Sequence, residues 1–177
     1  MTEGKKKMNE TLDWLIHIAV AVVVGVLIVT FVAQRTVVHQ ISMQPVLYEG
    51  DNIIVEKISP KLSTLHKGDI IVFNPPDENI QLIKRLIAVG GDNVEIKNGK
   101  VYVNGVADDK FNPEGVVTLP EGSMEYSNIH IPEGYVYALG DNRQESLDCR
   151  NFGPIKTSRI TGRAIFRFYP FNKFGKI

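Results

Sequence analysis

A run of twenty residues near the start of the chain, from Trp14 to Ala33, contains no Asp, Glu, Lys or Arg. Only His17 and Thr30 in this run are polar. At about 1.5 Å of rise per residue, a helix of this length spans roughly 30 Å, the thickness of the hydrocarbon core of a bilayer. The run therefore predicts a transmembrane helix over residues 14–33.

Two other structures are compatible with an apolar run of this kind. A cleaved signal peptide has a shorter apolar core, of about 7–15 residues, and ends in a small-x-small cleavage site. The sequence Val32-Ala33-Gln34-Arg35 at the end of the run matches such a site poorly. A core helix of a soluble domain has a polar face, and this run has none. We therefore favour a membrane anchor.

Charged residues on the two sides of the run indicate its orientation. Three consecutive lysines at positions 5–7 precede it, whereas Arg35 alone follows it closely. Lysine and arginine concentrate on the cytoplasmic side of membrane proteins. We therefore expect a cytoplasmic tail over residues 1–13 and a domain outside the cytoplasm over residues 36–177.

The balance of charge and the cysteine content restrict the class of protein. The chain has 177 residues, which suits one domain beyond the anchor, and its 20 Lys and Arg residues balance 20 Asp and Glu residues. A neutral chain offers no basic surface that favours nucleic acid as a partner. Cys149 is the one cysteine, so no disulfide within the chain is possible.

Short β-like runs follow the anchor, and no helical period persists after residue 35. Runs rich in Ile, Val and Tyr alternate with Gly, Pro and Asn residues, as is typical of strands and turns. Asn98-Gly99 favours a type I′ hairpin turn, because both central residues of that turn need positive φ. We expect a mainly β fold, an antiparallel coiled sheet or barrel-like domain. The expected strands are 52–56, 69–73, 94–97, 100–103, 135–139 and 160–169.

Residues 106–133 differ from the rest of this domain in composition. They are rich in Pro, Gly, Asp and Glu. Such residues favour turns and loops. We expect an insertion or a long loop beside the sheet.

The common cofactor and metal motifs are missing from the sequence. It contains no Walker loop, no GxGxxG, no HExxH and no paired-cysteine pattern. The four histidines are scattered, and one lies inside the apolar run. We therefore expect neither a metal nor a cofactor. The serine-enzyme motifs GxSxG and SxxK are also missing.

One lysine lies in a setting that favours an uncharged amine. Strand alternation over residues 80–87 puts Lys84 on the same face as Leu82 and Leu86, a face that is otherwise apolar. Burial of a lysine lowers its pKa by up to ~3–5 units from about 10.4. A neutral lysine is a general base that can activate a serine hydroxyl, and Ser42 is a candidate partner.

Other interpretations of these two residues stay open at this point. Lysines on apolar faces often extend to water, and serines are common in solvated turns. A histidine base for the serine is the competing hypothesis, with His39, His66 and His130 outside the apolar run. His39 points away from Ser42 if that segment is extended. Spacing alone does not bring Ser42 and Lys84 together.

Three segments carry most of the specific information in the chain. They are Ser42-Met43-x-Pro45-x-Leu47, Lys84-Arg85-x-Ile87-x-x-x-Gly91-Asp92 and Gly140-Asp141-Asn142-Arg143-x-x-Ser146-x-Asp148-x-Arg150-x-Phe152-Gly153. In order and spacing they resemble the SMxPTL, KRVIGxPGD and GDNRxxSxDSRxFG motifs of bacterial type I signal peptidases, the leader peptidase family of Ser–Lys dyad proteases. The resemblance covers essentially the whole chain, anchor included.

The resemblance implies a mechanism and a set of catalytic residues. Ser42 is the expected nucleophile, and neutral Lys84 is the expected general base, which then delivers the proton to the leaving amine. Ser146 matches the serine that orients the family's lysine by a hydrogen bond. Three further residues match polar groups that brace the site, although a purely structural ion-pair network is the other interpretation of them. These are Asp141, Asp148 and Arg150.

The chain departs from the family's motifs at four positions. Gln40 stands where the family often has Ser or Gly, two residues before the nucleophile. A side chain there helps the oxyanion hole in some members, and a Gln40 amide is able to donate as well. Cys149 replaces a serine and removes a good hydrogen-bond donor. Val46 replaces threonine, and Gly90 replaces proline.

The resemblance also implies the substrate and a location at the membrane. The expected partners are the signal peptides of secreted preproteins, cut after small residues at positions −1 and −3, and membrane lipid. An extended substrate presents alternate side chains to one wall, so shallow apolar pockets select small residues. The residues expected to line these pockets, or else to be ordinary core, are Val38, Met43, Leu47, Leu82 and Ile83.

Two other functions are alternatives to that of a single-pass serine endopeptidase of the cell membrane. A catalytically silent relative that acts as a binding module in surface-polymer or pilus assembly is expected to lose the serine or the lysine, and this chain keeps both. A self-cleaving Ser–Lys repressor needs a DNA-binding domain before its catalytic part. This chain has the apolar run in that place.

Overall fold

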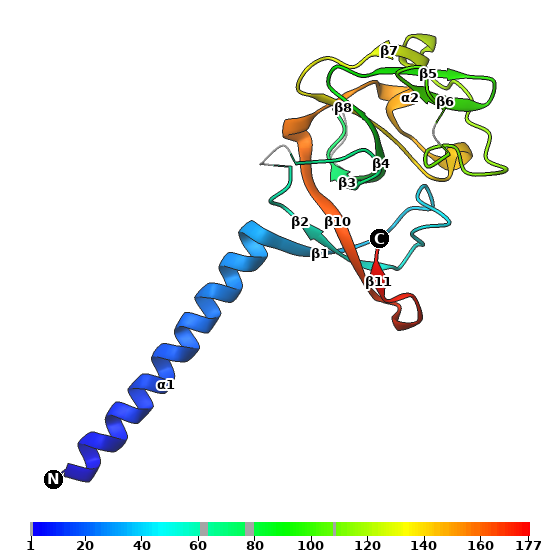
Figure 1. The fold of residues 1–177 in the computed structure, drawn as a ribbon. Helices are drawn as coiled ribbons and strands as arrows, with labels where there is room; N and C mark the ends of the chain where they lie inside the picture. Colours follow the sequence, from blue (N-terminus) through cyan, green and yellow to red (C-terminus); the bar gives the residue numbers. More distant parts are fainter. Residues whose placement is uncertain (1, 61–63, 77–79, 108) are drawn as a thin grey trace.

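A long helix stands away from a β-rich domain in the computed structural model (Figure 1). The structure describes residues 2–60, 64–76, 80–107 and 109–177, with side chains from Leu12 onward. Met1 and position 108, which fall in the predicted tail and the predicted loop, lie outside the described residues. Helix α1 (Thr2–Leu27) is followed directly by the π-helical turn η1 (Ile28–Val32).

The apolar part of the helix has no contact with the domain that would bury it. The stretch Leu12–Val32 has a mean hydropathy of 2.9, and none of it is buried inside the structure. The prediction of a helix up to Ala33 was one residue too long. Ala33 begins strand β1 (Ala33–Val37) and pairs with Glu56, so a partner elsewhere in the chain ends the helix.

The β domain contains two antiparallel sheets, and its mainly β antiparallel architecture confirms the predicted fold class. The further strands are β2 (Asn52–Glu56), β3 (Ile70–Phe73), β4 (Leu82–Val89), β5 (Asn93–Lys97), β6 (Lys100–Val103), β7 (Asn128–His130), β8 (Tyr135–Leu139), β9 (Ile155–Lys156), β10 (Ile160–Tyr169) and β11 (Gly175–Lys176). The large sheet has the order β1–β2–β10–β3–β4–β8–β9, with β11 on β10, and the small sheet has the order β6–β5–β7. The short helices are η2 (Met124–Ser127), η3 (Arg143–Glu145), α2 (Cys149–Phe152), η4 (Thr157–Arg159) and η5 (Phe171–Lys173).

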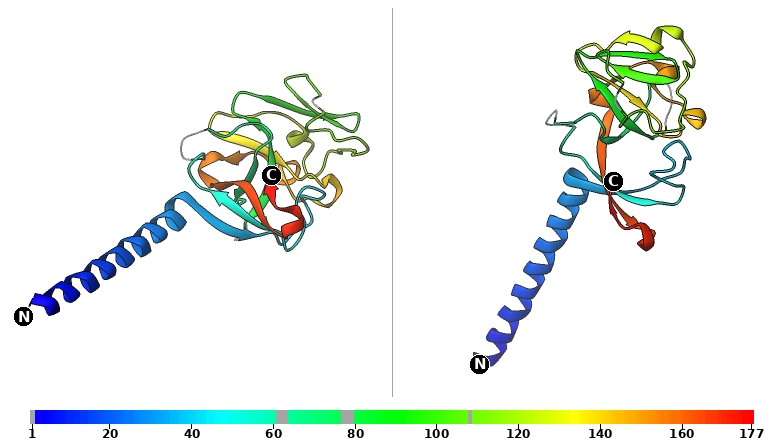
Figure 2. Two further views of the ribbon diagram at one scale, coloured as in Figure 1. Left: turned by 60° about the horizontal axis from the view of Figure 1, so that its bottom comes forward. Right: turned by 45° about the vertical axis from the view of Figure 1, so that its right-hand side comes forward.

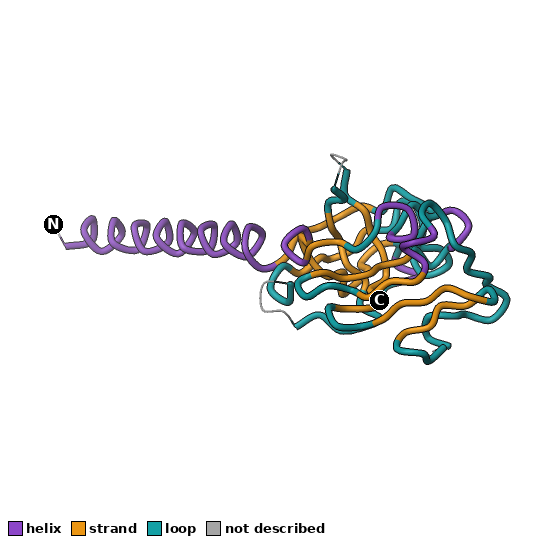
Figure 3. Tube along the Cα trace, turned by 90° about the horizontal axis from the view of Figure 1, so that it is seen from above, coloured by secondary structure: helices purple, strands orange, loops and turns teal. Residues whose placement is uncertain are grey.

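Strand β10 connects the two ends of the domain. It runs from the end near the small sheet to the end near the helix, where β1, β2 and β11 lie (Figures 1 and 2). Seen from above, the strands form one curled body with the helix projecting to one side (Figure 3). The curl follows in part from register shifts in β10 and β4, because bulges bend a strand.

All six predicted strands are present, four of them with the predicted bounds. The hairpin prediction is confirmed in detail, since Asn98 and Gly99 have φ values of 51° and 74°. The sequence analysis did not identify β1, β7, β9 and β11. The last two have two residues each, too few for an alternating pattern. Strand β7 and η2 fall within 106–133, so that range is not loop throughout.

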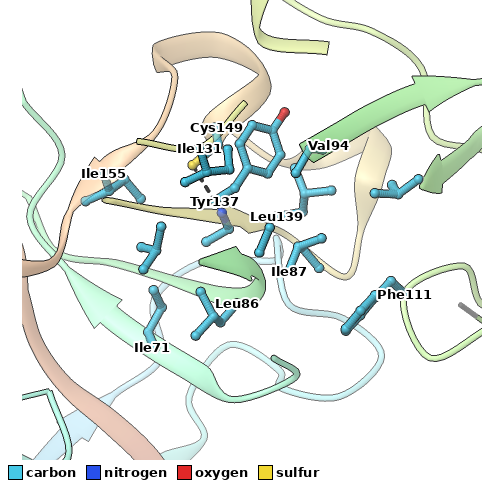
Figure 4. Close-up of a cluster of buried hydrophobic side chains, with 14 of the residues drawn as sticks. Ile71, Leu86, Ile87, Val94, Phe111, Ile131, Tyr137, Leu139, Cys149 and Ile155 are labelled. Carbon is cyan, nitrogen blue, oxygen red and sulfur yellow. Dashed lines mark hydrogen bonds between the residues drawn. The ribbon is translucent and has the colours of Figure 1, made fainter. Parts of the chain in front are cut away.

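Two hydrophobic clusters form the core. The larger one fills the space between the sheets, with Leu86 and Leu139 from the large sheet and Val94 from the small one (Figure 4). Phe111, from the predicted loop, belongs to this cluster and is buried. The smaller cluster lies beside the helix end of the domain. Its buried members are Val38, Met43, Leu47, Ile53, Val55, Ile70, Val72 and Ala164.

The turn at Asn98 and Gly99 gives a first testable prediction. A Gly99→Ala substitution forces an L-residue into positive φ, and its methyl group meets a Val117 methyl carbon at 3.1 Å. We expect it to destabilise the domain by about 1–2 kcal/mol. Asn98→Gly is the matched control, because glycine suits both central positions of this turn. Thermal unfolding of the detergent-solubilised chain measures both, and equal stability of the two variants would contradict the assignment.

Candidate active site

A tight turn after β1 holds Ser42 at the surface of the core. Met43 and Leu47, which follow it in the chain, are fully buried in the smaller cluster, and the Leu47 N–H donates to the Met43 carbonyl at 2.8 Å. Ser42 itself is only 5% exposed. The Asn142 N–H donates to the Ser42 carbonyl at 3.0 Å. The turn is therefore held by a bond within itself and by a bond from the segment after β8.

Lys84 reaches Ser42 from strand β4. Its side chain is fully buried and lies between Leu82 and Leu86, as strand alternation predicts. The Lys84 Nζ donates a hydrogen bond of 2.6 Å to the Ser42 Oγ. Burial lowers the pKa of the Lys84 amine to about 8, although the carboxylates of Asp148 and Asp141 raise it. An amine with this pKa is uncharged in about a tenth of molecules at pH 7 and in about half at pH 8, far more than an ordinary lysine.

A buried carboxylate, Asp148, organises the residues beside the lysine. It accepts hydrogen bonds from the Ser146 hydroxyl at 2.8 Å and from the Gly140 N–H at 3.1 Å. The Arg150 guanidinium donates to both of its oxygens, at 2.9 and 3.0 Å. The Ser146 hydroxyl thus bonds to Asp148 in this structure, and an orienting role for Ser146 towards Lys84 stays a prediction.

Gly140 permits the close approach of these segments. A Cβ atom at this position would lie 2.2 Å from the Ser146 Oγ and 2.6 Å from the Ser42 carbonyl oxygen. Real side chains do not tolerate such distances, so the turn of Ser42 and the segment of Ser146 can only pack this closely over a glycine. The motif contains this glycine, but the sequence analysis gave it no role.

Asp141 is held by an arginine from β4. Arg85 donates to its two carboxylate oxygens, at 2.7 Å each, and also to the Gly68 carbonyl at 2.8 Å. Such a bidentate ion pair fixes both the distance between the two groups and the plane in which they lie. It ties the segment after β8 to the strand that carries Lys84.

Two buried arginines connect this site to the segment that was predicted as a loop. Arg143 donates to the Phe111 carbonyl at 2.6 Å and to the Thr118 hydroxyl. Arg150 donates to the Leu119 carbonyl at 3.2 Å and forms an ion pair with Glu121 at 3.0 Å. Residues 111–121 are therefore part of the support of the site. Their composition gave no signal of this, because two of the contacts are made by backbone carbonyls and the arginines that make them all are distant in the sequence.

A cleft of about 540 Å³ opens beside Ser42. Three of the predicted pocket residues line it, namely Val38, Met43 and Ile83, and Gln40 lines it as an exposed residue. Leu47 and Leu82 lie in the hydrophobic core instead and do not line this cleft. The full lining is Gln34, Arg35, Thr36, Val37, Val38, His39, Gln40, Ser42, Met43, Ile80, Gln81 and Ile83.

The histidines that were considered as alternative bases lie in other surroundings. His39 is exposed at the cleft, and His66 is exposed near β3. The His130 ring bonds to Asn93 in the small sheet, at 2.9 Å. In the described part of the chain, the hydrogen-bond partner of the Ser42 hydroxyl is Lys84. No group of three or more His, Cys, Asp or Glu side chains there is arranged to hold a metal ion.

Cys149, which departs from the family's motif, is completely buried. Its sulfur accepts a hydrogen bond from the Ala138 N–H at 3.2 Å (Figure 4). Burial raises the pKa of this thiol, so it stays protonated and neutral. The replacement of serine by cysteine therefore places no charge next to Lys84.

Comparison with known proteins identifies the family of the chain. A family model described as "Signal peptidase, peptidase S26" matches residues 11–169. The chain belongs to this signal peptidase family. It is therefore a hydrolase of the serine peptidase class, and the resemblance noted in the three motifs is confirmed.

Individual members of the signal peptidase family match nearly the whole chain. A signal peptidase I of Bacillus licheniformis is 33% identical over 186 residues, covering 99% of each chain. A signal peptidase IB of Staphylococcus aureus is 37% identical over 181 residues, covering 94% of this chain and 93% of that one. The crystal structure of a signal peptidase I from Enterococcus faecalis is 32% identical and covers 56% of this chain and 95% of that one, with a TM-score of 0.46.

The buried pair of Asp148 and Arg150 gives a second testable prediction. Arg150→Met leaves the Asp148 carboxylate buried without its counter-charge, which we expect to cost about 3–5 kcal/mol of stability. The double variant Asp148→Asn with Arg150→Met should be less destabilised than Arg150→Met alone, because it removes the uncompensated charge. Denaturant unfolding followed by circular dichroism measures the three proteins. A double variant less stable than Arg150→Met would refute this account of the pair.

Proposed function

We propose that this chain removes signal peptides from secreted preproteins, with Ser42 as the nucleophile and Lys84 as the general base. The observation that carries the proposal is the 2.6 Å contact between the Lys84 Nζ and the Ser42 Oγ inside the protein. Burial of the amine makes its neutral form accessible. Family membership supplies the reaction class, and this contact supplies the two groups that the reaction needs.

The first chemical step forms an ester between Ser42 and the signal peptide. When Lys84 is neutral, the Ser42 hydroxyl donates to the amine, and Lys84 takes the proton as the Oγ attacks the scissile carbonyl. The bond to the leaving amine then breaks, and Lys84 returns the proton to that nitrogen. The mature protein leaves with a free amino terminus.

The second step releases the signal peptide. A water molecule attacks the ester carbonyl, and neutral Lys84 accepts the proton of the water. The Ser42 oxygen leaves and takes this proton back, which restores both side chains. The same short contact therefore serves both halves of the reaction, and each half starts from and returns to neutral Lys84.

The negative charge that develops on the carbonyl oxygen needs hydrogen-bond donors. We assign the Ser42 backbone N–H and the Gln40 side-chain amide to this role, because Gln40 lies at the cleft two residues before the nucleophile. Donors aimed at the developing charge contribute about 3–4 kcal/mol each in serine proteases. Gln40 is able to replace the shorter side chains found in other members, since its amide is both longer and a good donor.

The cleft suits an extended peptide that adds to two sheet edges. Strand β1 is at one edge of the large sheet, so its second side is open for pairing. Within the described chain, β4 pairs with β8 only from Arg85 onward, which leaves residues 82–84 open on that side. The cleft lies between these two edges, with lining residues from both. A substrate in β conformation is held there by its main chain.

The walls of the cleft favour small side chains at alternate substrate positions. Side chains at −1 and −3 point to the same side of an extended peptide. Val38 and Met43 are nearly fully buried and Ile83 is half-buried, so they offer shallow apolar walls near the nucleophile. We propose these three residues as the determinants of small-residue selection. Leu47 and Leu82 lie behind them and support the walls from the core.

We propose that the helix over Leu12–Val32 spans the cell membrane with the β domain outside the cytoplasm. The lysines at positions 5–7 support this orientation. The apolar surface of the helix is exposed rather than buried inside the structure, and lipid is the environment that suits it. The proposed domain division is a tail over 1–13, an anchor and a peptidase domain over 36–177.

Removal of either proposed catalytic group tests the function directly. We expect Ser42→Ala and Lys84→Met each to lower kcat for preprotein cleavage by at least about 10³-fold, because the two groups act as a unit. The assay uses the detergent-solubilised chain and electrophoretic separation of precursor and mature protein. Ser158→Ala and Lys156→Met are matched controls at exposed positions and should cleave normally. Normal cleavage by Ser42→Ala or Lys84→Met would contradict the assignment of these two residues as the catalytic groups.

The pH dependence of the reaction tests the state of the lysine. The protonated amine has no lone pair to accept the serine proton, so kcat/KM should fall about tenfold per pH unit below the pKa of Lys84 and level off above it. Since burial lowers that pKa to about 8, we expect the midpoint near pH 8.

A carboxylate variant shows whether this midpoint belongs to Lys84. The Asp141 carboxylate raises the Lys84 pKa, so Asp141→Asn should move the midpoint to lower pH. Asp109→Asn, an exposed carboxylate elsewhere on the surface, should leave it unchanged. An unchanged midpoint in Asp141→Asn would indicate that another group, such as a histidine, controls the rate.

A further inference from the structure

The end of the anchor helix has an uncommon hydrogen-bond arrangement. The last carbonyls of any helix have no partner within the helix. Here the Ala33 N–H donates back to the Ile28 carbonyl and closes the final π-helical turn, while the chain at Ala33 becomes extended. The carbonyls of Val29, Thr30 and Val32 belong to this last turn of the helix. Such groups are costly to leave unpaired near the hydrocarbon of a bilayer.

One residue of the β domain binds all three of these carbonyls. The Lys57 Nζ donates to the Val29 and Thr30 carbonyls, at 3.2 Å each. The Lys57 backbone N–H donates to the Val32 carbonyl at 2.8 Å. The positive charge also lies at the C-terminal end of the helix, where the helix dipole favours a cation. Side chain and backbone of one residue thus act together on the helix end.

Because of the position of Lys57 in the fold, these contacts connect the helix to the strands beside the cleft. It follows directly after β2, the strand that pairs with β1, and β1 continues from the helix and forms one wall of the cleft. The backbone joins the helix to the domain at Val32 and Ala33, because the Lys57 N–H donates to the Val32 carbonyl and Ala33 pairs with Glu56. The side chain of Lys57 adds a second attachment one helical turn away from that junction.

We propose that Lys57 is a positioning residue that locks the anchor helix to β2 and so sets the height and tilt of the cleft over the bilayer. This inference rests on the proposed function, in which Ser42 and Lys84 cut a peptide that emerges from the same membrane. Since β1 is both the continuation of the helix and a wall of the cleft, a change in helix angle moves the cleft by the same angle. Lys57 therefore determines which peptide bond of a membrane-inserted substrate reaches Ser42.

The test compares a substrate whose position is fixed by the bilayer with one that diffuses freely. The full-length chain is reconstituted into vesicles of phosphatidylcholine and phosphatidylglycerol. One substrate is a preprotein inserted in the same vesicles, with two Ala-x-Ala sites in tandem a few residues apart. The other is a short water-soluble peptide that contains one such site. Mass spectrometry identifies the bond that is cut, and kcat and KM are measured for both substrates.

Lys57→Met removes the ammonium group but keeps the aliphatic stem. We expect this variant to lose about tenfold in kcat/KM on the inserted preprotein, since small displacements of a reacting bond are costly, and to distribute its cuts over both tandem sites. Cleavage of the soluble peptide should stay within about twofold of wild type, because Lys57 does not touch the cleft. Lys57→Arg should restore the single site and the rate. Lys156→Met, at an exposed position on β9, is the matched control.

Three results would overturn the inference, and they are distinguishable from one another. Wild-type rate and a single cut site in Lys57→Met would show that the helix end needs no lock. An equal loss on both substrates would show that Lys57 supports the fold rather than the placement of the cleft. A wild-type protein that cuts neither substrate would refute the proposed function itself, and this inference with it.

Discussion

A lysine side chain that is closed off from water is the constraint on which the rest of the domain depends. Lowering the pKa of Lys84 from 10.5 to about 8 means that the core disfavours the ammonium form, relative to the neutral amine, by roughly 3 kcal/mol more than water does. The two carboxylates near it would restore the charge if they were unpaired. Each is instead held by an arginine, Asp148 by Arg150 and Asp141 by Arg85. The arginines therefore limit how strongly these acids favour a charged lysine.

Buried hydrogen bonds take the place of disulfides in fixing the site. The groups around Ser42 come from segments that are far apart in the sequence, and the short contact with Lys84 requires all of them to hold their positions. The Asn142 N–H bonds to the Ser42 carbonyl, and the Arg143 and Arg150 side chains bond to carbonyls within 111–121. Such bonds are directional, so they set distances more sharply than apolar packing does. A chain with Cys149 as its one cysteine depends on this network.

Sequence reasoning succeeded where a local rule determines structure. Strand alternation put Lys84 on the apolar face, and turn chemistry identified the hairpin at Asn98-Gly99, because both depend only on neighbours in the chain. It did not find β1, since the end of the helix at Ala33 depends on pairing with a distant strand. It could not separate Leu47 and Leu82, which are core, from cleft residues such as Ile83, because all are apolar. The roles of Gly140 and of 111–121 come from tertiary contacts that no local pattern records.

The positions of the proposed anchor and of the proposed nucleophile follow from one continuous piece of chain. Ser42 is nine residues beyond Ala33, so even a fully extended segment keeps it within about 30 Å of the helix end. The first four of those residues belong to β1, whose pairing with β2 makes the segment stiff rather than flexible. A stiff segment transmits the direction of the helix to the cleft, and a flexible one would not. A peptidase whose substrates are themselves held by a membrane gains specificity from such stiffness, because a bond at the wrong depth never reaches the serine whatever its side chains.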